Sequence, residues 1–164
     1  MRKNIVILFV GLLSCSKIAP TEFSEKAKKD VFISIYNNEV TFNEILSKNK
    51  GKKILIDVWA SWCKDCLKGL PNVKNVQEEY PEVVYVFLSL DRDKESWKNG
   101  IKRLKVKGQH YYIQSGWEGD FGAFLGLDWI PRYLVIDQKG KIDVFNATKV
   151  TDSRITKSLE KKIN

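Results

Sequence analysis

A pair of cysteines, Cys63 and Cys66, follows directly on an apolar run, and this arrangement constrains the fold more than any other feature of the chain. The run, residues 54–59, has the length and the β-branched content of a buried strand. Residues 63–80 then carry apolar side chains at spacings of three, which is typical of one face of a helix. The two thiols are therefore predicted to lie where a strand passes into a helix, and they form a candidate redox pair.

Similar patterns predict the other elements, and together they indicate one α/β domain. Strands are expected at 31–36, 83–90 and 111–114, and as a hairpin of 133–136 and 141–145 around Gly140. Helices are expected at 41–50, 93–105 and 121–125, and from 152 onward. Thr41 and Glu44 form a capping box at the start of the first of these helices. Strands 54–59 and 83–90, with a helix between them, predict a parallel βαβ unit.

The N-terminal residues have the order of a bacterial export signal. Two basic residues, Arg2 and Lys3, precede an apolar stretch, 5–13, that is too short to span a bilayer. Leu12-Leu13-Ser14-Cys15 at its end resembles a lipobox, so we expect cleavage before Cys15 and a lipid on its sulfur. Two alternatives stay open: an uncleaved signal anchor, and an ordinary signal peptide with an incidental cysteine.

These signals divide the chain into three parts. Residues 1–14 are the expected lipoprotein signal peptide, and residues 15–30, which are polar and rich in lysine, are the expected tether. Residues 31–164 are the expected domain. We therefore expect a lipid-anchored protein of the cell envelope, attached to a membrane and facing the periplasm or another extracytoplasmic space.

The charge and cysteine content exclude some functions. The formal net charge is +8, but the lysines are scattered and no nucleic-acid motif is present, so nucleic-acid binding is not expected. With Cys15 acylated, Cys63 and Cys66 are one remaining pair in a compartment where disulfides persist. A closed zinc site needs four ligands, and the sequence has no second pair and no histidine cluster, so no metal is expected. The single histidine, His110, is expected on the surface.

Four features stand at a family-like spacing: Trp62-Cys63-x-x-Cys66, Asp57 before it, Pro71 in the following helix, and Ile130-Pro131 before the hairpin. With this order of strands and helices, the chain resembles thioredoxin-fold proteins, in particular the membrane-tethered TlpA/ResA-like thiol-disulfide oxidoreductases. The resemblance implies a central mixed β-sheet flanked by helices, with an insertion before a strand that begins at a cis Pro131. It implies a monomer without a cofactor, whose partners are protein thiols or disulfides and an upstream membrane or periplasmic thiol that donates electrons.

The chain departs from thioredoxin itself at two places. Lys64-Asp65 stands between the cysteines where thioredoxin commonly has Gly-Pro, so the redox potential does not carry over. Phe87 stands where the resemblance places the lysine that partners the buried aspartate, so Asp57 is expected to lack that cation. The segment 108–129 resembles the insertion of the tethered family and is a candidate region for partner recognition.

The two cysteines are expected to have unequal roles. Cys63 stands at the expected helix start, where unpaired amides and the helix dipole stabilise a thiolate, so it is the predicted attacking residue. Cys66 lies one turn further inside and is predicted to resolve the mixed disulfide. Asp57 is predicted to be buried and to exchange a proton with Cys66. The alternative is a solvated, idle aspartate at a strand edge.

Trp62 and the peptide at Ile130-Pro131 are the predicted substrate contacts. The resemblance places Ile130 opposite the cysteines, where its backbone would pair with an extended substrate. The alternative for Pro131 is a proline that simply begins an edge strand. Trp117 and Trp129 line either a recognition surface or a local core.

These features predict an extracytoplasmic protein thiol-disulfide oxidoreductase that acts as a reductant through Cys63 and Cys66. Three alternatives stay open. A disulfide oxidant or isomerase would use the same residues in another direction. A thiol peroxidase can share the fold, although the Thr-x-x-Cys pattern of a peroxiredoxin is absent. A tethered binding module would use the cysteine pair only to staple the start of a helix.

Overall fold

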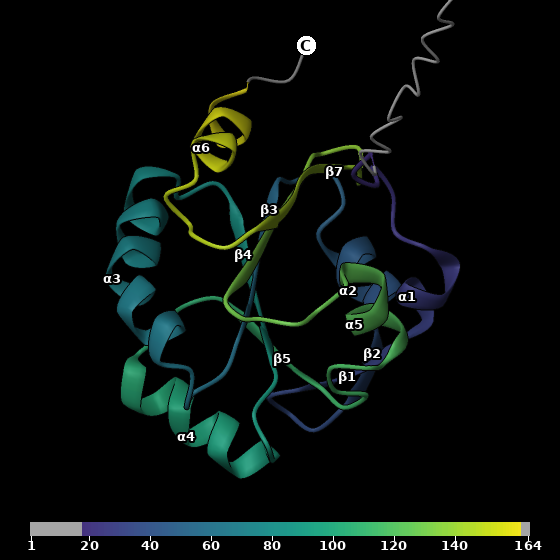
Figure 1. The fold of residues 1–164 in the computed structure, drawn as a ribbon, viewed down its shortest axis with the longest axis vertical. Coiled ribbons are helices and arrows are strands. Elements are labelled where there is room, and N and C mark those ends of the chain that lie inside the picture. The colour runs from purple at the N-terminus through teal and green to yellow at the C-terminus, as the bar shows by residue number, and fades with distance from the viewer. Residues whose placement is uncertain (1–17, 162–164) are drawn as a thin grey trace, which may run out of the picture.

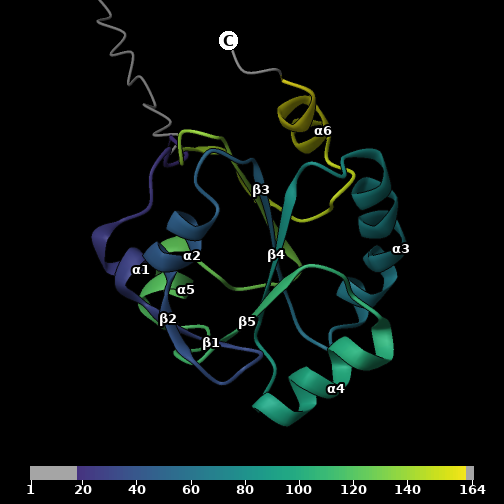
Figure 2. The same ribbon diagram turned by 180° about the vertical axis from the view of Figure 1, so that it is seen from behind.

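In the computed structural model, which describes residues 18–161, a seven-stranded mixed sheet lies between two groups of helices (Figure 1). The strands are β1 (Val31–Ser34), β2 (Glu39–Thr41), β3 (Ile54–Trp59), β4 (Val84–Ser89), β5 (Gln109–Ile113), β6 (Arg132–Ile136) and β7 (Ile142–Ala147). The helices are α1 (Glu25–Lys29), α2 (Phe42–Lys48), α3 (Lys64–Glu79), α4 (Lys94–Leu104), α5 (Asp120–Leu125) and α6 (Ser153–Glu160). In both Figure 1 and Figure 2, α3, α4 and α6 lie on one side of the sheet and α1, α2 and α5 on the other.

The centre of the sheet is β3, the strand that precedes the cysteines. The strands are ordered β2-β1-β5-β4-β3-β6-β7, so β3 pairs in parallel with β4 and antiparallel with β6. All of its residues are buried, because strands flank it on both sides and helices cover both faces, which explains its continuous apolar run. The predicted mixed sheet and the parallel βαβ unit of β3, α3 and β4 are confirmed.

Local sequence signals determine where several elements begin and turn. The Thr41 hydroxyl accepts a hydrogen bond from the Glu44 amide (3.2 Å), and the Glu44 carboxylate accepts one from the Thr41 amide (2.7 Å). The predicted capping box is therefore confirmed. The predicted hairpin is also present as β6 and β7, and Gly140 adopts φ +83° in its turn. Helix α3 begins directly after Cys63, as predicted.

Residues 23–30, which we predicted to be part of the tether, instead belong to the folded domain. Ser24 caps α1 by accepting a hydrogen bond from the Ala27 amide at 3.2 Å, and Phe23 and Ala27 are both buried. The ring centres of Phe23 and Phe42 lie 4.6 Å apart, so this segment completes the aromatic core beneath α2. Two apolar residues four positions apart are too short a helical pattern to stand out in a lysine-rich stretch.

The predicted signal peptide and the predicted lipid on Cys15 fall on residues 1–17, outside the described residues. Among residues 18–161, no helix has the length and apolar content needed to cross a membrane.

The segment 108–129 supplies both a strand and a helix. Strand β5 lies inside the sheet, parallel to β4 and antiparallel to β1. Helix α5 packs its Phe121 ring against Phe42, with ring centres 4.6 Å apart. The strand and the short helix that we predicted here are confirmed, with ends shifted by one or two residues. The segment therefore joins the sheet and leads back to the start of β6.

Candidate active site

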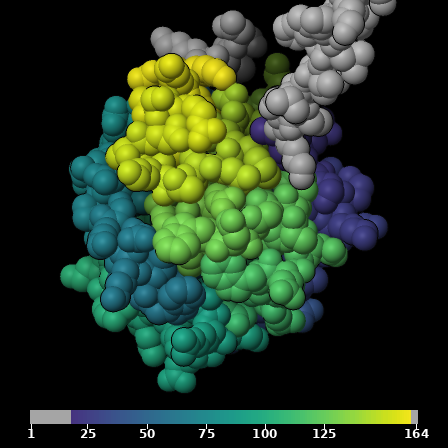
Figure 3. Space-filling view, viewed as in Figure 1, coloured from purple at the N-terminus to yellow at the C-terminus, as the bar shows by residue number. Residues whose placement is uncertain are grey.

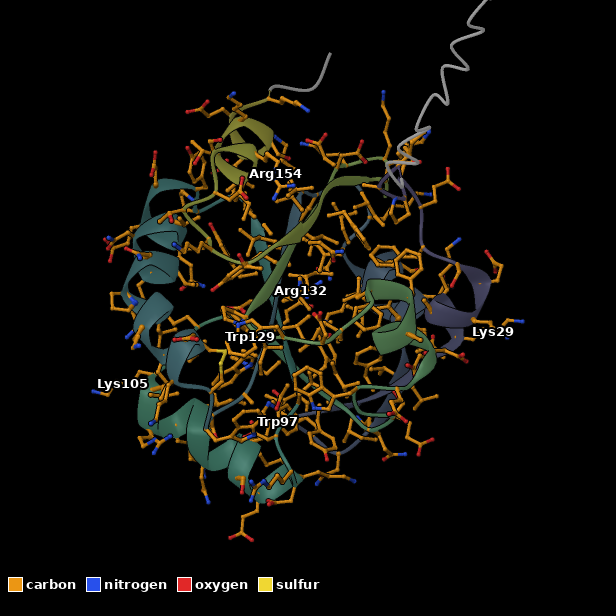
Figure 4. The ribbon with its side chains drawn as sticks, viewed as in Figure 1. Lys29, Trp97, Lys105, Trp129, Arg132 and Arg154 are labelled. Carbon is orange, nitrogen blue, oxygen red and sulfur yellow. A yellow bond between two sulfur atoms is a disulfide. The ribbon has the colours of Figure 1, made fainter. Side chains whose placement is uncertain are left out.

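Cys63 and Cys66 lie at the start of α3 and are joined by a disulfide, drawn as the yellow bond in Figure 4. Cys63 is the N-cap of the helix, and the Cys66 amide donates a hydrogen bond to the Cys63 sulfur at 3.1 Å. This amide belongs to the first helical turn, where amides have no partner within the helix. After reduction of the disulfide, the amide and the helix dipole therefore stabilise a thiolate at Cys63.

Strand β6 brings the proline of the predicted site to the cysteines. Because β6 runs antiparallel to β3, its first residues lie beside the end of β3, where the cysteine loop begins. The Ile130-Pro131 peptide is cis, as predicted, and the Ile130 carbonyl oxygen lies 3.7 Å from the Cys63 sulfur. An extended chain that pairs with this backbone would place its own sulfur next to Cys63.

Asp57 lies in the middle of β3 and is 4% exposed. Its neighbours in the sheet are Phe87 on β4 and Tyr133 on β6. The Asp57 Oδ1 atom has no hydrogen-bond partner within residues 18–161, and burial raises the pKa of this carboxyl to about 8. The alternative of a solvated aspartate at a strand edge is therefore wrong. A carboxyl with this pKa can gain and lose a proton near neutral pH.

An open groove of about 530 Å³ lies beside the disulfide. Its lining comes from the start of α3 and from the segment that leads into β6, two parts of the chain whose surfaces meet in Figure 3: Trp62, Cys63, Lys64, Asp65, Lys68, Trp117, Asp128, Trp129 and Ile130. Both cysteines are buried, and Cys63 is the one that lines the groove. Trp62 and Trp129 are 50% and 58% exposed, which favours the recognition surface over the local core for Trp129. Trp117 lines the groove and also packs against the core.

A buried carboxylate that the sequence analysis did not single out holds the cysteine loop. Asp91, 5% exposed, accepts hydrogen bonds from the Ser61 amide (3.0 Å), the Ser61 hydroxyl (2.7 Å) and the Ser89 hydroxyl (2.8 Å). The Arg103 guanidinium donates to the Ser61 carbonyl at 3.1 Å. A Cβ atom on Gly100 would lie 2.4 Å from the Ser61 Cβ, so α4 packs directly on this loop. Ser61 stands two residues before Cys63, and these contacts fix the approach to the nucleophile.

His110, expected on the surface, is buried instead. It lies on β5 with its ring stacked on Phe87 at 5.1 Å between centres, and its Nε2 lies 3.0 Å from the Val106 carbonyl oxygen. Burial lowers the pKa of His110 and so favours the neutral ring. The prediction of a surface position was wrong because the residues around His110 are polar and basic, and this composition did not indicate that they form β5, an inner strand of the sheet. Residues 18–161 contain no group of three or more His, Cys, Asp or Glu side chains placed to hold a metal ion.

The sheet order, the Cys-x-x-Cys disulfide at a helix start and the cis proline facing it define a thioredoxin-fold thiol-disulfide oxidoreductase. Residues 50–142 match the family model described as thioredoxin-like, and the chain belongs to this family.

Curated relatives and solved structures that are similar to this chain carry names of the same class. The thiol-disulfide oxidoreductase ResA of Bacillus thuringiensis is 25% identical over 154 residues, covering 87% of each chain. The thiol:disulfide interchange protein DsbE of Haemophilus influenzae is 29% identical, covering 77% of this chain and 66% of its own. The solution structure of a Bacteroides vulgatus protein described as a thiol-disulfide oxidoreductase is 31% identical, with a TM-score of 0.65, and the match covers 79% of this chain and 82% of that one.

Proposed function

We propose that this protein is an extracytoplasmic thiol-disulfide oxidoreductase that reduces disulfides in other proteins. One observation carries the proposal: Cys63 lines an open groove, on a helix N-terminus and 3.7 Å from the Ile130 carbonyl oxygen. Similarity to relatives named thiol-disulfide oxidoreductase ResA and thiol:disulfide interchange protein DsbE supports disulfide exchange, and the predicted export signal at residues 1–14 supports the extracytoplasmic location.

The reaction begins from the reduced pair. The Cys63 thiolate attacks one sulfur of a substrate disulfide, forming a mixed disulfide and releasing the other substrate sulfur as a thiolate. Cys66 then attacks the Cys63 sulfur, which re-forms the Cys63–Cys66 disulfide and releases the second substrate thiol. Two electrons have passed to the substrate, and an upstream membrane or periplasmic thiol restores the reduced pair.

Asp57 is the proposed proton acceptor for Cys66. The second attack needs a Cys66 thiolate, and a buried carboxyl whose pKa is about 8 takes up that proton more readily than an ordinary aspartate. The proton returns to Cys66 when the pair is reduced again. Burial of Asp57 in β3, the strand that leads into the cysteine loop, supports this role.

The substrate is proposed to bind as an extended chain across the groove. Trp62 and Trp129 supply exposed aromatic area, and the backbone at Ile130-Pro131 supplies hydrogen-bonding groups. This mode suits unfolded or flexible proteins, whose backbone is free to pair. A lipid on Cys15 would keep the domain at a membrane of the cell envelope.

Insulin reduction, with dithiothreitol as electron source, tests the proposal. The wild type is expected to reduce insulin and the Cys63→Ser variant is not; the potential of the pair is expected near about −270 mV. A potential near about −120 mV would instead indicate an oxidant, and activity that survives in Cys63→Ser would overturn the assignment to this pair. Absence of any exchange activity in the wild type would favour a binding module. Mass spectrometry of membrane-derived protein tests Cys15, since an unmodified thiol there contradicts the lipid anchor.

A further inference from the structure

Arg132 is a buried charge in a strand that is otherwise apolar or aromatic. It is the first residue of β6, directly after the cis proline, and is 6% exposed. All five residues of β6 are buried, and its other four are Tyr133, Leu134, Val135 and Ile136. Burying a guanidinium is costly unless its donors are used, so the contacts of Arg132 indicate what it does.

The Arg132 guanidinium makes two hydrogen bonds to the segment that leads into the cis proline. Its Nη2 donates to the Asp128 carboxylate at 2.9 Å, and its Nη1 donates to the Leu125 carbonyl at 3.4 Å. Leu125 is the last residue of α5, and that carbonyl is one of those a helix leaves without an internal partner. The side chain therefore ties the end of α5 and the middle of the loop to the sheet.

The tied loop carries one wall of the groove. Trp129 and Ile130 stand between Asp128 and Arg132, so they lie in the part of the α5–β6 loop that the Arg132–Asp128 contact closes. In the view of Figure 4, Trp129 lies between Arg132 and the yellow disulfide. The position of this loop determines how far the Trp129 ring and the Ile130 carbonyl stand from the Cys63 sulfur.

We propose that Arg132 is a positioning residue for substrate recognition: its guanidinium holds Leu125 and Asp128 so that Trp129 and Ile130 form the wall opposite Cys63. This inference rests on the proposed disulfide exchange with protein substrates. Arg132 itself is shielded from the groove, since it does not belong to the groove lining. It acts through the loop and belongs to recognition, whereas the disulfide chemistry belongs to Cys63 and Cys66.

Arginine suits this task better than lysine. The planar guanidinium presents donors in a fixed fork and reaches two acceptors at once, while an ammonium is a single point on a flexible stem. The Arg132 Nε atom has no hydrogen-bond partner within residues 18–161, so the side chain is held by its two terminal nitrogens. A lysine at this position is expected to keep one of the two contacts.

The test compares Arg132→Met and Arg132→Lys with wild type in the reduction of insulin. In Arg132→Met we expect the KM for insulin to rise about tenfold while kcat falls less than about twofold, because two hydrogen bonds from a charged group are lost from the recognition wall. Arg132→Lys is expected to recover part of that KM. With oxidised glutathione, which is too small to span the groove, the rate should fall much less than with insulin.

Lys53 provides the matched control, because it is a buried cation that also donates to backbone carbonyls. It is 8% exposed, and its Nζ donates to Leu159 (2.8 Å) and Lys161 (2.6 Å) at the end of α6. Lys53→Met is expected to lower the midpoint of thermal unfolding but to leave the KM for insulin unchanged. If Lys53→Met and Arg132→Met raise the KM equally, the effect is general destabilisation and the proposal is wrong.

Asp128→Asn keeps the test decisive if Arg132→Met does not fold. Asp128 is 84% exposed, so this variant is expected to fold and to raise the KM for insulin about threefold. In the double variant with Arg132→Lys the two effects should be less than additive, because both act on one contact. Full additivity, or a wild-type KM in a folded Arg132→Met, contradicts the inference. A wild type that reduces neither insulin nor oxidised glutathione contradicts the proposed function instead.

Discussion

The groove has two walls that are held in different ways. The wall at residues 61–66 carries the chemistry: a carboxylate with three donors fixes Ser61, α4 packs against the same residue, and α3 begins at Cys63. The wall at residues 128–131 is attached to β6 and tied by one guanidinium, whose acidic partner is largely exposed. The reactive cysteines therefore lie where several contacts determine the geometry, whereas the proposed recognition residues lie on a loop that fewer contacts hold.

The largest expected effect tests whether the chemistry belongs to the first wall. Cys66→Ser should lower the turnover of insulin by at least about 10³-fold, because the mixed disulfide at Cys63 can form but is not resolved. Non-reducing gels should show the trapped adduct. Cys63→Ser is the control and should trap nothing. A trapped adduct in Cys63→Ser, but not in Cys66→Ser, would reverse the roles of the two cysteines.

Asp57 lies in β3, the strand that leads to the first wall, and its burial is expected to cost stability. The raised pKa means that the folded state keeps a proton which the unfolded state releases, so stability should fall as the pH rises from about 4 to about 8. Asp57→Asn removes this loss and should stabilise the oxidised protein by roughly 2–4 kcal/mol at pH 8, with little gain at pH 4. Urea unfolding at the two pH values measures it. Asp65→Asn, at an exposed position, should change stability by less than about 0.5 kcal/mol.

The same variant separates stability from mechanism. Loss of the carboxyl should remove the step near pH 8 from the pH profile of disulfide exchange, because no group then accepts the Cys66 proton. An unchanged profile in Asp57→Asn would exclude Asp57 from the reaction, whatever its effect on unfolding.

Asp91 tests how firmly the first wall is held. Asp91→Asn should destabilise the protein by about 2–3 kcal/mol, because an amide accepts fewer of the three hydrogen bonds and adds a donor that faces other donors. Asp93→Asn, at the exposed cap of α4, is a matched control that should cost less than about 1 kcal/mol. Urea unfolding compares the two. Equal losses would mean that the buried contacts of Asp91 hold the first wall no more firmly than an exposed helix cap holds α4.

The smallest effect is expected at the second wall. Trp129→Ala should raise the KM for insulin about threefold and change unfolding by less than about 0.5 kcal/mol, because the ring is 58% exposed and contributes contact area more than core packing. Tyr36→Ala, which removes another exposed aromatic ring away from the groove, should leave the KM unchanged. A large loss of stability in Trp129→Ala would place this residue in the core.

Much of the fold followed from the sequence because its signals are local. The apolar run of β3, the capping box at Thr41 and the glycine turn at Gly140 each predicted an element that the structure contains. Short elements were missed for the same reason. Helix α1 and strand β2 have five and three residues, too few for a period to appear. Helix α1 also packs against α5, which lies far along the chain.

The sequence by itself determined the reactive pair. Cys63 and Cys66 follow a strand and are three positions apart, so at the start of a helix their side chains lie on the same turn. It also located the proline and the aspartate, through the resemblance they carry. Only the tertiary structure decided what holds these groups. Asp91 reaches Ser61 across thirty residues, and Arg132 binds a loop that its own sequence neighbourhood does not mark as structured. Hydrogen bonds of buried charges depend on which strands become neighbours, and no local pattern records that choice.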